Sequence, residues 1–272
     1  MAGRRGRRRE KGDKQSEWYF DQTTFLQELS DAEAVAREAA RRALRMLGAR
    51  KIDSGIMPVI LTPEMTKSFI RGLLGALNGD MIYKKSSFLL DQLGEKIAAP
   101  RFTLIDDGTL DRRSGSRPFD GEGLKTRRQA LIEDGVLKQY LYDTYTANKA
   151  GAKPTGTASR GYNSLPGIGT TNLYLEPGQA TPADLYRGVE RGLLVTGMMG
   201  SGVNTVNGEY SRGARGLLIE HGEPTAPVQE ITVAGNLLDM LKDIDLIADD
   251  LDWRGGTGAP SIRFAKLTVA GK

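Results

Sequence analysis

The stretch that decides the fold is Phe119–Gly151, FDGEGLKTRRQALIEDGVLKQYLYDTYTANKAG. Within it, Glu133-Asp134-Gly135 separates two runs, Arg128–Ile132 and Val136–Tyr142. An Asp-Gly pair readily takes the positive φ angles of a tight turn, so the two runs are predicted to form an antiparallel hairpin. The following residues, Asp143–Ala150, are predicted to be helical.

Hydrophobic periodicity and turn residues place further elements on both sides of this hairpin. Helices are predicted over 30–47, with a capping box at Ser30–Glu33, and over 62–79, 88–93 and 236–247. A further helix is predicted to open at Thr181-Pro182-Ala183-Asp184. Strands are predicted over 57–61, 102–105, 172–175, 193–195, 217–219, 228–233 and 262–269. Hairpins outnumber strand–helix–strand crossovers. The predicted class is therefore α+β, with helices in the first third and a mainly antiparallel, barrel-like sheet in the remainder.

The amino-acid composition excludes several kinds of protein and of functional site. The 272 residues contain no cysteine, which excludes disulfides and thiolate metal sites and favours the cytoplasm. No apolar run approaches the roughly 20 residues that a membrane-spanning helix needs, so no membrane partner is expected.

The net charge of +4 comes from one terminal tract. Residues 1–14 carry a surplus of five positive charges, and the rest of the chain sums to about −1. Arg4–Arg9 could neutralise nucleic-acid phosphates, which gives an alternative function as a nucleic-acid-binding protein. No aromatic residue is interleaved with the arginines, so a solvated tract is the favoured interpretation.

The number of histidines limits which metal-binding and catalytic sites this chain could form. His221 is the only histidine and lies in a predicted turn, Glu220–Glu223. A zinc site would need carboxylates alone, and a Ser-His-Asp arrangement would depend on this one ring. The acidic residues between Asp243 and Asp252 lack EF-hand spacing and are interpreted as a solvated helix end.

Two glycine-rich segments are the candidate contact regions. Tyr210–Gly216, YSRGARG, carries Arg212 between glycines, so the backbone could approach a partner while a guanidinium reaches a carboxylate or carbonyl. The loop over 197–208 lacks the Lys-Ser/Thr ending of a phosphate-binding loop and is interpreted as a structural turn. The candidate chamber or partner contacts are Arg212, Gly213, Gly216, Gly200, Gly202 and Asn236.

The chain resembles the TldD/PmbA family, the peptidase-related proteins also called modulators of DNA gyrase, over nearly its whole length. The resemblance extends the alternative function of Arg4–Arg9 to a DNA-gyrase-associated binding protein. Besides the opening stretch, the resemblance rests on GLLGALNGD at 72–80, KKSSFLLDQLGEKI at 84–97, FTLIDDG at 102–108, YSRGARG and ITVAGNL at 231–237. The YSRGARG run matches the PmbA, or TldE, branch. Family members usually carry a large N-terminal domain. We therefore expect residues 1–22 to be a basic tract plus a remnant strand of that domain, and 23–272 to be the core domain.

The resemblance also predicts what the chain lacks. TldD-type members hold zinc with an HExxxH helix and a later cysteine, but the aligned positions here are Ile70, Arg71 and Gly75. The resemblance therefore implies a non-catalytic subunit that binds no metal itself and is inactive alone. It implies that this subunit pairs with a zinc-holding TldD-type metallopeptidase, or with itself. The substrate of the pair would be unfolded peptides.

Overall fold

The computed structural model describes residues 2–10 and 13–272, and side chains from Lys14 onward. The hairpin predicted from the opening stretch is confirmed as β5 (Arg128–Glu133) and β6 (Val136–Leu137). Its turn places Asp134 at φ 48° and Gly135 at φ 83°, the left-handed values that a tight hairpin requires. The second strand ends at Leu137, earlier than predicted. Lys138 N–H still donates to the Leu131 carbonyl, but by Leu141 the backbone N–H donates to the Leu77 carbonyl, away from β5.

This hairpin belongs to a five-stranded sheet with the order β12-β7-β4-β5-β6. Its other strands are β4 (Leu104–Asp107), β7 (Leu173–Leu175) and β12 (Thr257–Gly258). Helix α4 (Thr144–Ala150) follows the hairpin and is capped by Asp143, whose carboxylate accepts from the Thr146 N–H at 2.7 Å.

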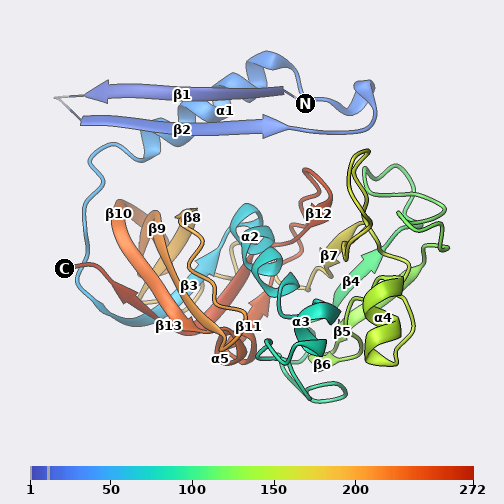
Figure 1. Cartoon of the computed structure of the whole chain (residues 1–272). Coiled ribbons are helices and arrows are strands. Elements are labelled where there is room, and N and C mark those ends of the chain that lie inside the picture. The colour runs from blue at the N-terminus through green and yellow to red at the C-terminus, as the bar shows by residue number, and fades with distance from the viewer. Residues whose placement is uncertain (1, 11–12) are drawn as a thin grey trace.

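The second sheet closes into a barrel. Its order is β10-β9-β8-β3-β13-β11, and β10 also pairs with β13, so five strands form a ring with β11 outside it (Figure 1). Only β3 and β8 run parallel among the barrel neighbours. The strands are β3 (Gly55–Leu61), β8 (Arg191–Met199), β9 (Glu209–Glu220), β10 (Glu223–Asn236), β11 (Ile244–Ile247) and β13 (Ile262–Ala270). The predicted α+β class with a barrel-like core is confirmed.

Both faces of the central barrel strands are buried. On β3, Val59 and Leu61 join a large apolar core that continues into the five-stranded sheet. Ile60, between them, points the other way and packs with Leu194 and Leu217 in a smaller cluster. Two-sided burial explains why β3 reads as a continuous apolar run.

Among the remaining helices, α1 (Ala32–Arg45) and α2 (Pro63–Leu74) are long and the others are short. The others are η1 (Leu26–Glu28), α3 (Gly79–Tyr83) and α5 (Leu237–Lys242). None of the helices in the described ranges has the length and apolar character that crossing a membrane requires.

The N-terminal residues form a second hairpin of β1 (Ala2–Glu10) and β2 (Asp13–Asp21). Figure 1 shows this hairpin and α1 together above the barrel and α2. The arginine tract is thus a paired strand and not a loose tail, because every residue of β1 has a partner on β2. The side chains of Arg4–Arg9 lie outside the described part, so the nucleic-acid alternative stays a prediction, as does the domain division at residue 22.

Four predicted helix features are wrong. Helix α1 is capped by Asp31, which accepts from Ala34 N–H at 2.7 Å, and not by Ser30. The first long helix after it ends at Leu74, before the predicted 79. Residues 88–93 form turns, because Asp91 takes a left-handed φ of 59°. Residues 181–187 also form turns, because the Asp184 carboxylate bonds back to the Thr181 N–H.

Two sheet boundaries also differ. The helix predicted over 236–247 ends at Lys242, because Ile244–Ile247 pair with β13 as strand β11. The strand predicted to stop before Asp106 continues through Asp107. Asp106 can be buried there because its carboxylate accepts from both the N–H and the hydroxyl of Thr171.

Candidate functional site

Helix α2 separates the apolar core from a polar cleft. It begins as the sequence predicts, with Thr62 at the N-cap and Pro63 in the first turn. Phe69, Ile70 and Leu73 lie on the core face and are almost fully buried. The opposite face carries a polar stripe at helical spacing, namely Glu64, Lys67, Ser68 and Arg71.

The polar stripe lines a cavity of about 280 Å³, which we call the α2 cleft. Strand β2 covers one side of it, and β8 and β9 form another. Its lining residues are Glu17, Trp18, Tyr19, Phe20, Arg42, Glu64, Met65, Lys67, Ser68, Arg71, Thr196, Gly197, Met198, Arg215 and Arg254.

One ion-pair network runs along the cleft. Lys67 Nζ lies 2.7 Å from Asp252 Oδ2, and Arg254 Nη2 lies 2.7 Å from the same oxygen. Arg254 also reaches Glu64 through Nη1 at 3.0 Å, and Arg42 Nη2 reaches Glu64 at 3.0 Å. The network therefore ties α1, α2 and the segment before β12 to one another.

Charged and aromatic contacts hold the N-terminal hairpin over the cleft. The Tyr19 ring of β2 contacts two guanidinium groups, those of Arg42 at 4.6 Å and Arg254 at 4.8 Å from its centroid. Glu17, also on β2, accepts a 3.0 Å ion pair from Arg215 of β9. Cation–π contacts strengthen when water is excluded. The cation–π contacts of Tyr19 and the ion pair of Glu17 together hold β2 against the core.

Burial shifts the pKa values of this network. Desolvation lowers the pKa of Lys67, although its bond to Asp252 opposes the shift. Burial alone would raise the pKa of Asp252, but hydrogen bonds from Arg254 and Lys67 lower it to about 2. Burial raises the pKa of Glu17 against the attraction of Arg215. Shifts of this kind occur at functional sites and also in structural ion-pair networks.

Two arginines at the cleft have no carboxylate partner among the residues that the structure describes. The Arg71 side chain is on the exposed part of α2, and its Nε donates to Thr257 Oγ1 at 3.3 Å. Arg212 donates through Nη1 to Ser68 Oγ at 2.7 Å, and its buried Nε has no acceptor. The cleft thus keeps unneutralised positive charge.

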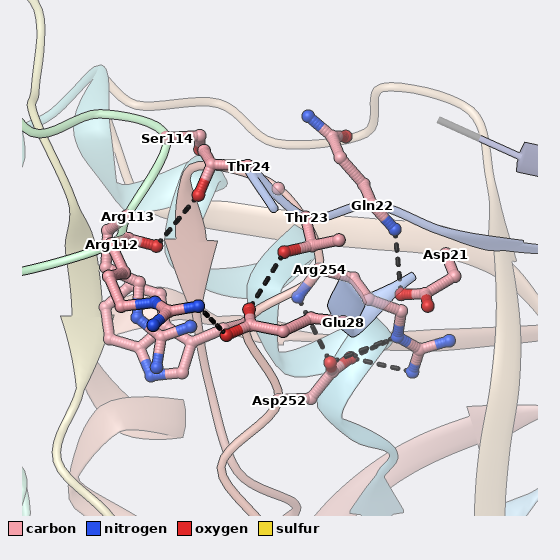
Figure 2. A pocket seen from close by; sticks show the side chains of 12 residues that line it. Asp21, Gln22, Thr23, Thr24, Glu28, Arg112, Arg113, Ser114, Asp252 and Arg254 are labelled. Atoms are coloured by element: carbon pink, nitrogen blue, oxygen red, sulfur yellow. Dashed lines mark hydrogen bonds and ion pairs between the residues drawn. The ribbon is translucent and has the colours of Figure 1, made fainter. Parts of the chain in front are cut away.

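A second hollow of about 250 Å³ adjoins the cleft at Asp252 and Arg254 (Figure 2). Thr24 Oγ1 donates to the Arg112 carbonyl at 3.1 Å, and Arg112 pairs with Glu28. These contacts bind the segment after β2 to the loop before β5, so this hollow lies between the N-terminal residues and the core.

The positions aligned with a zinc helix do not fit a metal. Ile70 faces the core, fully buried, and Arg71 brings a positive charge to the cleft. Gly75 has no side chain, and a Cβ there would lie 2.9 Å from Thr205. Across the described residues, no three of His, Cys, Asp and Glu gather closely enough to hold an ion. These three positions therefore supply no metal ligand.

The structure brings one of the six sequence-predicted contact residues, Arg212, to the cleft, through Ser68. Gly202 and Gly216 instead allow close backbone packing, since a Cβ would lie 1.7 Å from the Ser211 carbonyl oxygen and 1.8 Å from the Leu194 one, respectively. Gly200 takes a φ of 76° after β8.

The other two predicted contact residues lie within or beside the barrel. Gly213 is on β9, where it pairs with Met199 of β8. Asn236 caps α5, where it accepts from Leu238 N–H and donates to the Asn207 carbonyl. Neither lines the cleft. Whether these glycines and Asn236 contact a partner chain stays a prediction.

Sequence reasoning missed Lys67 and interpreted Asp252 as part of a solvated helix end. That interpretation is wrong, because Asp252 is ion-paired and lies ten residues past the end of α5. The available signal was the polar stripe of α2, where a lysine faces away from three apolar neighbours. His221 lies in the β9–β10 turn at φ 52°, exposed beside Glu190, as predicted for a turn residue.

Comparison with known proteins matches residues 54–271 to the PmbA/TldA metallopeptidase C-terminal domain. A metalloprotease PmbA homolog of Haemophilus influenzae is 38% identical over 87% of this chain and 51% of its own. A metalloprotease TldD homolog of the same organism is 32% identical over 94% of this chain and 56% of its own. The crystal structure of TldE from Thermococcus kodakarensis has a TM-score of 0.88 and 27% identity, and covers 97% of this chain and 61% of its own. The chain thus spans about half the length of the curated relatives it matches.

Proposed function

Because the chain belongs to the PmbA/TldD metallopeptidase family, we propose that it is the PmbA-type, non-catalytic subunit of a TldD-type metallopeptidase. In this role it completes the chamber that receives unfolded peptides, while a TldD-type partner holds the zinc ion. We place this pair in the cytoplasm, in keeping with the absence of cysteine from the sequence.

The observation that carries the proposal is the α2 cleft. The helix that aligns with the family's zinc helix does line a cavity, but it presents Lys67 and Arg71 there. Two cationic side chains repel a divalent cation, and neither can serve as a general base in its charged form. The two carboxylates of the lining, Glu17 and Glu64, are held in ion pairs with arginines. A surface of this kind suits a subunit that positions peptide for a partner.

Two further findings support a paired role. Haemophilus influenzae has relatives named for both branches, PmbA and TldD, and the PmbA homolog is the more similar to this chain. The resemblance of YSRGARG to the PmbA branch points the same way. A family in which two kinds of chain occur in one cell is consistent with division of work between them.

The test combines the purified chain with the TldD-type protein of its own organism and zinc. We expect the two proteins to coelute in size-exclusion chromatography and to cleave a fluorescence-quenched, unstructured peptide. Neither this chain alone nor a mixture in which the partner's zinc histidines are alanine should cleave it. Cleavage by this chain alone would contradict the non-catalytic role. Self-association of this chain without coelution would contradict the pairing.

A further inference from the structure

The α2 cleft carries more positive than negative charge. Its lining contains five cationic side chains and two carboxylates, those of Glu17 and Glu64. Asp252 is not part of this lining, and it is already bound by Lys67 and Arg254. The carboxylates are therefore occupied by ion pairs, and positive charge is left over.

Within the lining, the surplus is located at Arg71, and Arg212, which lies outside the lining but bonds Ser68, adds to it. Arg42 and Arg254 share Glu64, and Arg215 holds Glu17. In the described part of the chain, Arg71 and Arg212 pair with no acid. Arg212 of β9 lies beside the stripe because it bonds Ser68, and Arg71 follows Ser68 by three residues on the same helix face.

A guanidinium group is a planar fork of donors that matches a carboxylate. Arg71 uses only Nε, on a neutral hydroxyl at 3.3 Å, so both terminal nitrogens remain to donate. Trp18, Met65 and Met198 line the same cavity and offer apolar surface beside the charge. Such a combination suits an amino-acid residue that carries a carboxylate, more than it suits a small inorganic anion.

We propose that the α2 cleft is a binding site for a carboxylate of an extended peptide, held by Arg71 with Arg212 and Ser68 beside it. The carboxylate can come from the peptide's C-terminus or from an acidic side chain. This inference deepens the proposed function and rests on it for the nature of the ligand. The binding itself needs no partner chain and can be measured on this chain alone.

The test uses isothermal titration calorimetry with three unstructured, acetylated peptides of the same length. One has a free C-terminus, one is amidated, and one is amidated but contains a central glutamate. We expect at least one carboxylate-bearing peptide to bind about tenfold more tightly than the uncharged amide, as a charge-assisted hydrogen bond predicts. The stronger of the two identifies the source of the carboxylate.

Variants locate the site. Arg71→Gln should reduce the affinity for the preferred peptide to that of the amide, and Arg71→Lys should retain part of the preference. Arg127→Gln removes the same charge from an exposed arginine outside the cleft and should change nothing. Thermal unfolding of each variant checks that it folds, and Arg71 is suited to this because its side chain is exposed.

Three outcomes overturn the inference: equal affinity for all three peptides, binding of none at millimolar concentration, or a preference that survives Arg71→Gln. The proposed function fails separately. If no complex forms with a TldD-type partner but Arg71→Gln still abolishes the carboxylate preference, the site stands and the subunit role does not.

Discussion

The two faces of α2 are built on opposite principles. On the core face, Phe69 packs edge-on against Phe264 and Tyr210, with ring centroids 5.4 Å and 6.0 Å away. On the cleft face, Lys67 is as inaccessible to water as many core residues, at 5% exposure, yet it is held by a single carboxylate. Twelve residues of one helix thus separate an apolar environment from a charged one.

The difference between the two faces shows which positions of α2 tolerate substitution. Apolar packing is set by shape and volume, so the core face must stay close to its present form. The cleft face is set by charge balance, and a residue such as Arg71, exposed and without an acid, is not required by the fold. A side chain that the fold does not require is a candidate for contact with another molecule.

The largest expected effect is on the core face. Phe69→Ala should lower the free energy of unfolding by about 4 kcal/mol, because it removes a fully buried ring and leaves a cavity. Urea denaturation measures this. Phe119→Ala, at a side chain that is 60% exposed, should cost less than about 0.5 kcal/mol. Equal losses in the two variants would show that α2 does not pack as described.

A smaller effect is expected from the charged face. Asp252→Asn should lower the free energy of unfolding by about 3 kcal/mol, because it leaves the buried Lys67 ammonium without its carboxylate. The matched control is Asp249→Asn, since Asp249 is exposed. A variant as stable as the control would mean that water reaches Lys67 and that the ion pair contributes little.

The smallest expected effect is a dependence of the free energy of unfolding on pH. The pKa of Asp252 is about 2 in the folded chain, below the ordinary 3.8, so its stabilising contribution is complete above pH 4 and disappears as the pH falls towards 2. Between pH 5 and 2, the parent chain should therefore lose about 2 kcal/mol more than Asp252→Asn. The raised pKa of Glu17 acts in the opposite direction, but it cancels in this difference. Parallel stability curves for the two proteins would contradict the assignment.

Much of the fold could be predicted from local sequence signals. The Asp134-Gly135 turn, the Thr62-Pro63 start of α2 and the His221-Gly222 turn are dictated by φ preferences and missing N–H groups, which act within a few residues. Predictions failed where distant backbone competed, as at Ile244–Ile247, which pair with β13 instead of extending α5.

The α2 cleft shows the same division between what local sequence predicts and what distant contacts decide. Composition alone determined that this chain has one histidine and no cysteine. That Ile70, Arg71 and Gly75 stand where TldD-type relatives carry their zinc helix is a prediction from the family resemblance. That Lys67 meets Asp252, 185 residues away, and that Arg212 reaches Ser68 on α2, was decided only by the tertiary structure. Side-chain identity is a local property, but charge balance depends on which distant residues the barrel brings together, and no spacing along the chain encodes it.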